Sequence, residues 1–351
     1  MFSPSGYSFE PLACLVCPRQ TSCGVSVVMR GRATRARRLG LRLAVLLVLL
    51  LGAGKAPAQD ASPLHQALDD AWWTGPMLAN SAETLPSGHM LIEPYFYDVA
   101  SKGSDAFGSR AYVLYGLTDR LTVGLIPIIG YNRVSNGPNS SGIGLGDQIV
   151  QAQYRLTRFH EGSWLPTLAV QLQETLPTGR YDNLARASDG MGGGAWATTL
   201  GLNAQSYFWM PNGRLLRVRL NLTRTFNGDA DVSGASVYGT APGFHGTARP
   251  GDAFYIGTSF EYSVTRRWVL ALDLFRSHDA ATRVDGGTDP ADALPVPVHL
   301  QAGSSDAYGY APAVEYSFNA NLGVLLGARV IVGGHNATRS LTPAIAINYV
   351  H

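Results

Sequence analysis

Apolar and polar residues alternate along long stretches of this chain. In residues 121–131 the odd positions are apolar or aromatic, whereas the even positions are small or mixed. Residues 216–223 alternate more sharply, because Leu216, Val218, Leu220 and Leu222 oppose Arg217, Arg219, Asn221 and Thr223. Side chains on a β-strand point to opposite faces in turn. The pattern therefore predicts strands with one apolar and one polar face.

The predicted strands are long. A strand tilted in a bilayer needs about 9–11 residues to cross the hydrocarbon, whereas strands of soluble sheets average about 5–6. Most of the predicted segments have ten to twelve residues, which favours membrane-crossing strands. The twelve segments are 89–98, 109–117, 121–131, 146–157, 166–176, 196–208, 215–226, 253–264, 268–278, 308–318, 322–333 and 341–351.

The connections between these segments alternate in length. Short turns are predicted at 118–120, 158–165, 209–214, 265–267 and 319–321. Long connections are predicted at 99–108, 132–145, 177–195, 227–252, 279–307 and 334–340. Outer-membrane barrels have short periplasmic turns, longer outer loops and an even number of strands. The sequence thus predicts an all-β fold, a transmembrane up-and-down antiparallel β-barrel of about 12 strands over residues 88–351.

Aromatic residues recur beside the short turns. An outward tyrosine closes a strand just before a polar turn in four places, and further aromatic residues share that level. The set is Tyr115, Tyr154, Tyr262, Tyr316, Phe208, Trp268 and Tyr349. Amphipathic rings belong at the membrane–water interface, where barrels carry aromatic girdles. We expect these residues to form the lower girdle.

The N-terminal region predicts export. Six arginines between Arg30 and Arg42 precede twelve apolar residues, 43–54, and the small-residue sequence Ala56-Pro57-Ala58. This order is typical of a signal peptide (29–58), cut after Ala58, and the apolar run is too short for a membrane helix of about 20 residues. Met29 is then a plausible true start and residues 1–28 a mis-called leader. All three cysteines, Cys14, Cys17 and Cys23, fall in that leader.

Removing residues 1–58 reverses the sign of the net charge. Lys+Arg falls from 27 to 19 and Asp+Glu from 25 to 24, so the net charge changes from +2 to −5. The basic character belongs to the leader and signal peptide. Nucleic acid is therefore not an expected partner.

Four short motifs resemble a known family. They are Leu85-Pro-Ser-Gly-His89, Tyr115-Gly-Leu-Thr-Asp-Arg-Leu121, Gly144-Leu-Gly-Asp147 and Leu176-Pro-Thr-Gly179. In their order and spacing, residues 80–351 resemble the outer-membrane transporters named for the meta-pathway of phenol degradation. The resemblance implies a barrel strongly and phenol uptake loosely. We expect Asp147 to organise the entry of a strand rather than to bind a ligand.

The inward-facing charges are balanced. A backbone radius of roughly 12 Å would leave a narrow lumen between side chains. Five acidic and five basic residues are expected to line it: Glu93, Asp147, Glu261, Asp273, Glu315, Arg110, Arg155, Arg217, Arg219 and Arg329. A strongly ion-selective pore would carry a ring of one sign. Balance favours either a pore for uncharged or weakly polar solutes or a lumen closed by salt bridges. We expect Arg217 and Arg219 to face Asp147 or Glu261 across the lumen.

Residues 59–87 precede the barrel. They contain the sequence Asp69-Asp-Ala-Trp-Trp-Thr-Gly-Pro76. The segment could be a periplasmic lid, a plug inside the barrel or a flexible lead. Paired tryptophans usually pack on a surface, so we favour docking against the lower rim.

The sequence predicts a channel rather than an enzyme. No His-x-Ser pair and no metal-ligand spacing occurs, so no catalytic, cofactor or metal site is expected. We predict passive diffusion of small uncharged or aromatic organic solutes across the outer membrane of a Gram-negative bacterium. The alternative is a non-conducting structural barrel or one whose loops, 227–252 and 279–307, bind partners; a lipid hydrolase comes third. Expected partners are outer-membrane lipid, lipopolysaccharide, the barrel-assembly machinery and a small organic solute.

Overall fold

The computed structural model describes residues 65–288 and 296–351. The predicted leader, the signal peptide and the three cysteines lie outside these residues. Among the described residues, no helix is long and apolar enough to cross a membrane. Two short 3-10 helices, η1 (Leu68–Asp70) and η2 (Ala187–Asp189), are present.

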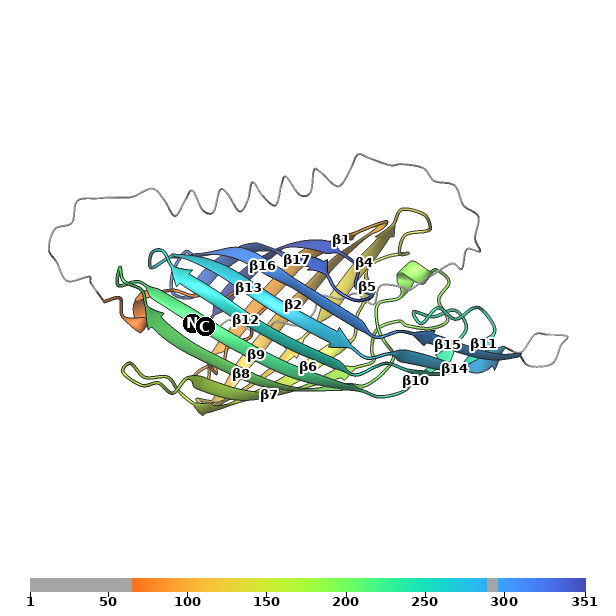
Figure 1. Ribbon diagram of the computed structural model, residues 1–351, viewed down its shortest axis with the longest axis horizontal. Coiled ribbons are helices and arrows are strands. Elements are labelled where there is room, and N and C mark those ends of the chain that lie inside the picture. Colours follow the sequence, from red (N-terminus) through yellow and green to blue (C-terminus); the bar gives the residue numbers. More distant parts are fainter. Residues whose placement is uncertain (1–64, 289–295) are drawn as a thin grey trace. The chain divides into compact units, whose positions relative to one another are not determined.

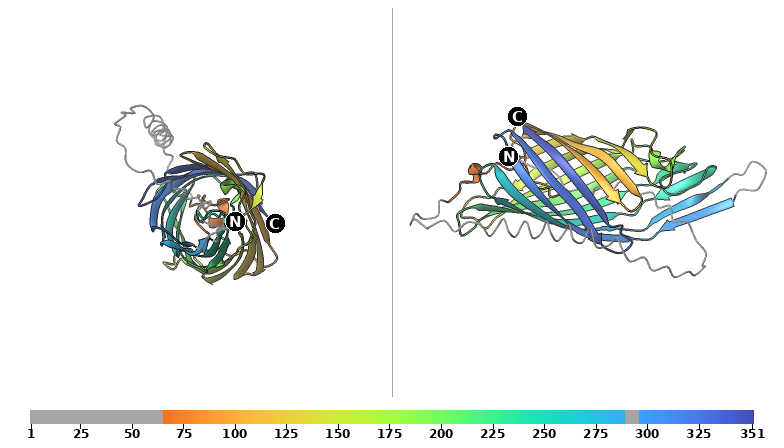
Figure 2. Two further views of the ribbon diagram at one scale, coloured as in Figure 1. Left: turned by 90° about the vertical axis from the view of Figure 1, so that its right-hand side faces the viewer. Right: turned by 90° about the horizontal axis from the view of Figure 1, so that it is seen from above.

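The described chain is dominated by one closed antiparallel sheet (Figures 1 and 2). Neighbouring strands pair in chain order, and β1 pairs with both β2 and β18, which closes the barrel. The strands are β1 (Met90–Ser101), β2 (Ser104–Thr118), β3 (Leu121–Ile126), β4 (Ile128–Val134), β5 (Gly144–Leu145), β6 (Gln148–Thr157), β7 (Thr167–Leu176), β8 (Ala197–Trp209), β9 (Leu215–Asn227), β12 (Ala253–Ser263), β13 (Trp268–Asp279), β16 (Ser305–Ser317), β17 (Leu322–Gly333) and β18 (Ser340–Val350).

Two wall strands are each interrupted. β3 and β4 both pair with β2 and are separated only by Pro127, which has no N–H to donate to a ladder. β5 and β6 are likewise separated only by residues 146–147. Counting each interrupted pair once, the wall has twelve strands, and the predicted barrel is confirmed.

One predicted outer loop is wrong. Residues 99–108 were expected to form a long connection, but β1 continues to Ser101 and β2 begins at Ser104. Only Lys102 and Gly103 connect them, and Gly103 takes a positive φ of 91°. Alternation is weak in this polar stretch, so the strand ends looked like a loop in the sequence.

Two other predicted loops are largely ordered as strands. Residues 227–252 and 279–307 contribute β10 (Ala230–Ser233), β11 (Phe244–Arg249), β14 (Thr282–Thr288) and β15 (Val296–Ala302). These strands form a separate four-stranded sheet beyond the end of the barrel wall (Figure 1). Its small core includes Val232, Phe244 and Val284. We call it the outer sheet.

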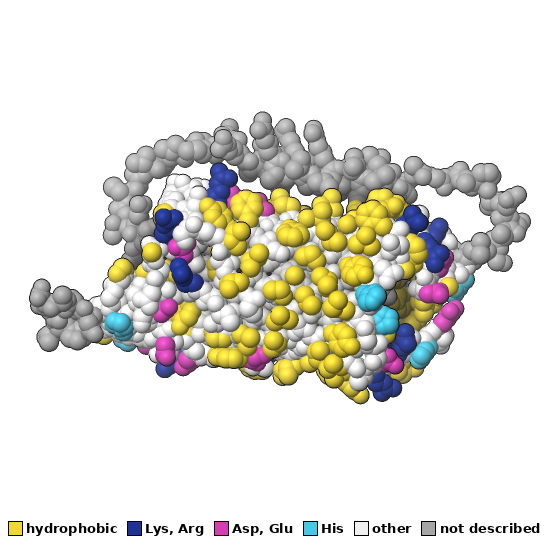
Figure 3. Space-filling view, turned by 180° about the vertical axis from the view of Figure 1, so that it is seen from behind, with side chains coloured by type: hydrophobic (Ala, Val, Ile, Leu, Met, Phe, Trp, Pro, Cys, Tyr) yellow, Lys and Arg dark blue, Asp and Glu magenta, His cyan; other side chains and the backbone are white. Residues whose placement is uncertain are grey.

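The outer surface of the barrel is apolar and its interior is polar. Leu200, Leu326 and Ile345 are 52%, 64% and 46% exposed, and apolar side chains cover the middle of the surface in Figure 3. Inside, Arg217, Glu261 and other charged residues are almost fully buried. This inversion is the arrangement of a barrel in lipid.

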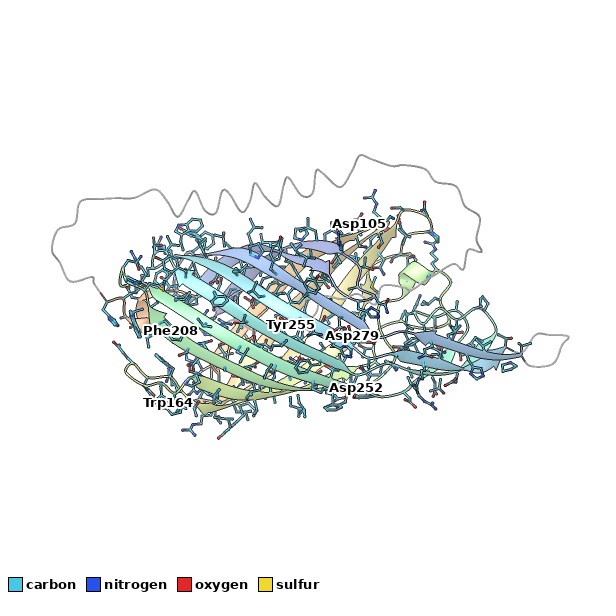
Figure 4. All side chains as sticks on the ribbon, in the orientation of Figure 1. Asp105, Trp164, Phe208, Asp252, Tyr255 and Asp279 are labelled. Atoms are coloured by element: carbon cyan, nitrogen blue, oxygen red, sulfur yellow. The ribbon has the colours of Figure 1, made fainter. Side chains whose placement is uncertain are left out.

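Aromatic side chains gather at the short-turn end. Phe208 and Trp164 lie at the end opposite to Asp105, Asp252 and Asp279 in Figure 4. Trp268 packs on Tyr316 with ring centroids 4.6 Å apart, and Tyr316 packs on Phe318 at 5.0 Å. Tyr115, Tyr154 and Tyr349 are also outward and exposed.

Candidate functional site

Residues 65–87, here called the inner segment, run inside the barrel (Figure 2). The segment begins at the short-turn end, where Gln66 N donates to Gly213 O at 3.0 Å and Trp72 N to Arg266 O at 2.9 Å. It also ends there, because Ser87 N donates to Asp119 Oδ1 at 3.0 Å. Between these points almost every side chain from residue 73 to residue 85 is buried. The segment is therefore a loop folded into the lumen.

Two wall carboxylates hold the backbone of the inner segment. Glu315 Oε2 accepts hydrogen bonds from Thr74 N at 2.8 Å, Gly75 N at 2.9 Å and Thr74 Oγ1 at 3.1 Å. Asp273 accepts from Leu78 N and Ala79 N, both at 3.1 Å. Each of these carboxyl groups accepts at least two hydrogen bonds from the segment and so fixes its backbone at one place. Met77, Leu78 and Leu85 of the segment pack into the apolar core as well.

Glu261 binds two arginines on the adjacent wall. Arg217 Nε donates to Glu261 Oε2 at 2.7 Å, and Arg217 Nη2 donates to Oε1 of the same carboxylate. Arg219 Nε lies 2.9 Å from Glu261 Oε2, and its Nη1 donates to Ala79 O at 2.9 Å. The Arg217 guanidinium also stacks 4.4 Å from the Trp73 ring. Of the two expected acidic partners, Glu261 occupies this place.

The neighbouring strands, β6 to β9, present amide side chains to the lumen. Asn80 Nδ2 donates to Gln171 Oε1 at 3.0 Å, and Gln153 Nε2 donates to Ser81 O at 3.0 Å. Arg155 Nη1 reaches Glu83 Oε2 at 2.7 Å. The amides also bond one another: the set is Gln151, Gln153, Gln171, Gln173, Asn203 and Asn221. The inner segment therefore spans from a charged wall to an amide wall.

The remaining predicted lumen charges are also buried. Glu93 Oε1 accepts from Asn348 Nδ2 at 3.1 Å. The Arg110 guanidinium lies 6.0 Å from the Tyr112 ring centroid, and that of Arg329 lies 4.7 Å from the Phe275 ring.

The sequence interpretation missed a set of inward aromatic residues. Tyr95 and Tyr112 meet edge to face at 5.9 Å, and Tyr255 stacks on Phe275 at 6.2 Å. All four are 1–8% exposed. Their signal was available, because Tyr95 shares the parity of Glu93 and Phe275 that of Asp273. The predicted aromatic positions covered only the outward residues beside the short turns.

Glycine allows the inner segment to approach the wall. A Cβ at Gly323 would lie 2.1 Å from Thr74 Cγ2. A Cβ at Gly327 would lie 2.8 Å from Ala313 Cβ and 3.2 Å from Met77 Sδ. The space that these two glycines of β17 leave is occupied by the inner segment.

Asp147 does not join the buried charges, which corrects the expectation that it faces Arg217 and Arg219. Its carboxylate accepts from Gly179 N at 2.9 Å and from Gly193 N at 2.6 Å, near the start of β6. Thr178 Oγ1 also donates to Gly146 O at 3.1 Å. Two of the sequence motifs thus meet here and fasten the 177–193 connection to the wall.

Along the inner segment, buried side chains occupy almost all of the lumen. A cavity of about 20 Å³ remains between the inner segment and the wall, beside Asn80, Leu85, Thr122 and Gln151. Such a volume holds about one water molecule. Any organic solute that crosses the lumen therefore requires the inner segment to move.

No group of three potential metal ligands occurs among residues 65–288 and 296–351.

Comparison with known proteins identifies the family and supports the fold. The model of the family described as "Putative MetA-pathway of phenol degradation" matches residues 92–347. The chain matches no curated protein. Among solved structures, an outer-membrane channel from Pseudomonas putida F1 aligns with a TM-score of 0.57 and 17% identity, covering 77% of this chain and 98% of that one. This likeness supports the barrel fold, and a barrel with an apolar outer belt indicates an outer-membrane location.

Two further solved barrels are more distant. The translocator domain of the autotransporter NalP from Neisseria meningitidis has a TM-score of 0.40 and 12% identity, with 90% of this chain and 96% of that one covered. The toluene transporter TbuX from Ralstonia pickettii has a TM-score of 0.36 and 11% identity, with coverage of 76% and 90%. Neither of these likenesses bears on the function of this chain.

Proposed function

The chain belongs to this phenol-degradation family, and we propose that it is a passive outer-membrane channel for small, uncharged or aromatic organic solutes. The observation that carries the proposal is the composition of the lumen. Its buried charged residues include both signs in nearly equal number, four acidic residues and five arginines, and four aromatic rings lie among them. A lumen of this kind suits weakly polar aromatic solutes better than ions of one sign.

The inner segment acts as a movable plug in this proposal. It is held by hydrogen bonds to Glu315, Asp273, Arg219 and the amide side chains. Its buried Met77, Leu78 and Leu85 also pack into the apolar core. When the segment leaves, water can replace its hydrogen bonds at each of these groups. The net loss is then about 0.5–1.5 kcal/mol for a neutral hydrogen bond and about 1.5–3 kcal/mol for one to a charged group.

A reversible cross-link tests both the channel and the plug. Thr74→Cys with Gly323→Cys places two thiols where the inner segment touches β17. The matched control pair is Asp285→Cys with His299→Cys, which are register partners in the outer sheet. Uptake of phenol and toluene into vesicles containing the protein is measured before and after reduction.

We expect the oxidised 74–323 pair to block uptake and reduction to restore it, while the control pair stays open in both states. Equal uptake with the 74–323 disulfide formed would rule out the plug. No uptake by any form would rule out the channel and favour the non-conducting barrel.

That second function has one observation in its favour, the filled lumen. A barrel with a surface role would use the outer sheet for its contacts. Planar-bilayer recording of the wild-type protein distinguishes the two, because a purely structural barrel shows no conductance at any applied potential. Lipid, lipopolysaccharide and the barrel-assembly machinery are proposed partners that follow from the membrane location.

A further inference from the structure

The barrel wall is interrupted near its outer end. β5 pairs with β4 through Ile129–Leu145 and Gly130–Gly144, and the described chain gives it no second partner strand. On its other side, residues 178–180 and 191–193 are held by Asp147 and Thr178 rather than by a strand ladder. The two sequence motifs that meet at Asp147 therefore build one side of a gap in the wall.

A cavity of about 400 Å³ fills this gap. Ile143, Leu145 and Met191 supply apolar surface to it, and Ile143 and Leu145 are 77% and 60% exposed. Thr178, Arg180 and Asp189 supply polar groups. Its volume lies within the range of about 300–1,000 Å³ of small-molecule sites, and the mixture of apolar walls with a few polar groups is typical of them.

The polar side of the cavity has one uncommitted cation. Asp189 Oδ1 accepts from Ser141 N at 2.6 Å and Ser141 Oγ at 2.9 Å, and the Ser141 N–H holds its pKa below the usual value. Asp189 is therefore ionised, and the positive charges of Arg186 and Arg180 both stabilise its negative charge. Within the described ranges, the Arg180 guanidinium has no hydrogen-bond or ion-pair partner. The three charges sum to +1.

We propose that this cavity binds a small aromatic carboxylate, with its carboxylate on Arg180 and its ring against Ile143, Leu145 and Met191. Guanidinium and carboxylate match in a two-pronged hydrogen bond, and the Met191 sulfur makes a favourable contact with an aromatic ring. The inference goes beyond the proposed function, because it assigns an anionic aromatic ligand to a site beside the outer end of the barrel, whether or not that ligand crosses the lumen.

Fluorine NMR of the full barrel in nanodiscs tests the site. The probe is 4-fluorobenzoate, and its line broadening is titrated against protein. The neutral probe 4-fluorobenzyl alcohol has the same ring without the charge, and acetate has the charge without the ring. Arg180→Gln removes the cation; Arg339→Gln is the matched control, because Arg339 is also exposed but does not line the cavity.

We expect saturable binding of 4-fluorobenzoate that Arg180→Gln weakens about tenfold or more, as expected for loss of a charged hydrogen bond. Arg339→Gln should leave it unchanged, and both other compounds should bind more weakly. Unchanged affinity in Arg180→Gln overturns the proposal. If 4-fluorobenzyl alcohol binds as tightly as 4-fluorobenzoate, the charge has no role. If acetate competes as well as an aromatic carboxylate, the site binds any small anion. Either result also overturns the proposal.

The vesicle uptake assay separates this inference from the channel proposal. Arg180-dependent binding without uptake by any form leaves the site and removes the channel. Uptake without Arg180-dependent binding leaves the channel and removes the site.

Discussion

At the scale of single residues, the interior charges depend on one another. Glu261 is fully buried and is the carboxylate that contacts both Arg217 and Arg219. A buried charge without a partner costs far more than the net value of the pair it came from. Glu261 is thus the carboxylate that compensates the charge of two buried guanidinium groups.

We predict that Glu261→Gln destabilises the barrel by about 3–5 kcal/mol, because it leaves two buried cations without their anion. The measurement is urea unfolding of the protein in lipid vesicles, followed by tryptophan fluorescence. The control is Asp252→Asn, which breaks an ion pair with the half-exposed Arg224 and should cost about 0–1 kcal/mol. A similar loss in both variants would contradict the prediction.

Parity in the sequence could predict which of these side chains face inward. It places Arg217, Glu261 and Glu315 on one set of positions, and the structure buries all three. It could not place Asp147, because the break at residues 146–147 interrupts the alternation between β5 and β6. Nor could it pair Arg217 with Glu261, since pairing depends on the register between β9 and β12.

At the scale of elements, the inner segment and β17 are matched in shape. Gly323 leaves room for Thr74, and Gly327 leaves room for Met77. The paired tryptophans divide between two environments: Trp72 lies beside Arg266 at the short-turn rim, whereas Trp73 is buried beside Arg217. Docking at the rim, favoured from the sequence, therefore describes only the first of them.

We predict that Gly323→Ala loosens the inner segment and raises the open probability in planar bilayers, because the added methyl would lie 2.1 Å from Thr74 Cγ2. The control is Gly333→Ala on the same strand, where the nearest atom lies 3.3 Å from the added carbon. Identical recordings from the two variants would show that the close approach does not hold the plug.

A second element-scale prediction concerns Asp147. Asp147→Ala removes the acceptor for Gly179 N and Gly193 N, so amide hydrogen exchange should become faster across residues 177–193. Exchange in β12 and β13 should not change. Asp229→Ala is the control, because the Asp229 side chain is 61% exposed and contacts only the exposed Arg249. Unaltered exchange in residues 177–193 would contradict a fastening role.

The outer sheet shows a limit of sequence reasoning at this scale. Its strands have four to seven residues, too few to cross a membrane. The search for membrane-length alternation therefore classed them as loops. They form because residues far apart in the chain, such as Ala248 and Val284, pair across the sheet.

At the scale of the whole molecule, the chain combines a lipid-facing wall with a lumen that its own N-terminal part fills. The number of wall strands could be predicted from period and composition alone, but not the full length of β1 and β2, which extend through the predicted loop 99–108. The path of the inner segment could not, because it depends on individual hydrogen bonds to side chains on strands spread from β3 to β16.

We predict that deletion of residues 66–83 yields a folded barrel with a larger single-channel conductance than the full chain. Heat-dependent migration in detergent gels checks that the barrel has folded. The expected increase follows from removal of the side chains that now occupy the lumen. Equal conductance in the deleted and complete proteins would show that ions take another route.

Export predicts a defined new terminus. Protein isolated from outer membranes should begin at Gln59, as N-terminal sequencing or intact mass can determine. A terminus upstream of residue 43 would contradict the assigned cleavage site.

The position of the inner segment also constrains the order of assembly. The segment leads directly into β1, yet it bonds to Glu315 on β16, and closure is made by β1 meeting β18. If the barrel closed first, the inner segment would have to enter afterwards through the end that carries the short turns. We infer that the sheet instead closes around the segment, so that the segment already lies inside when β1 pairs with β18.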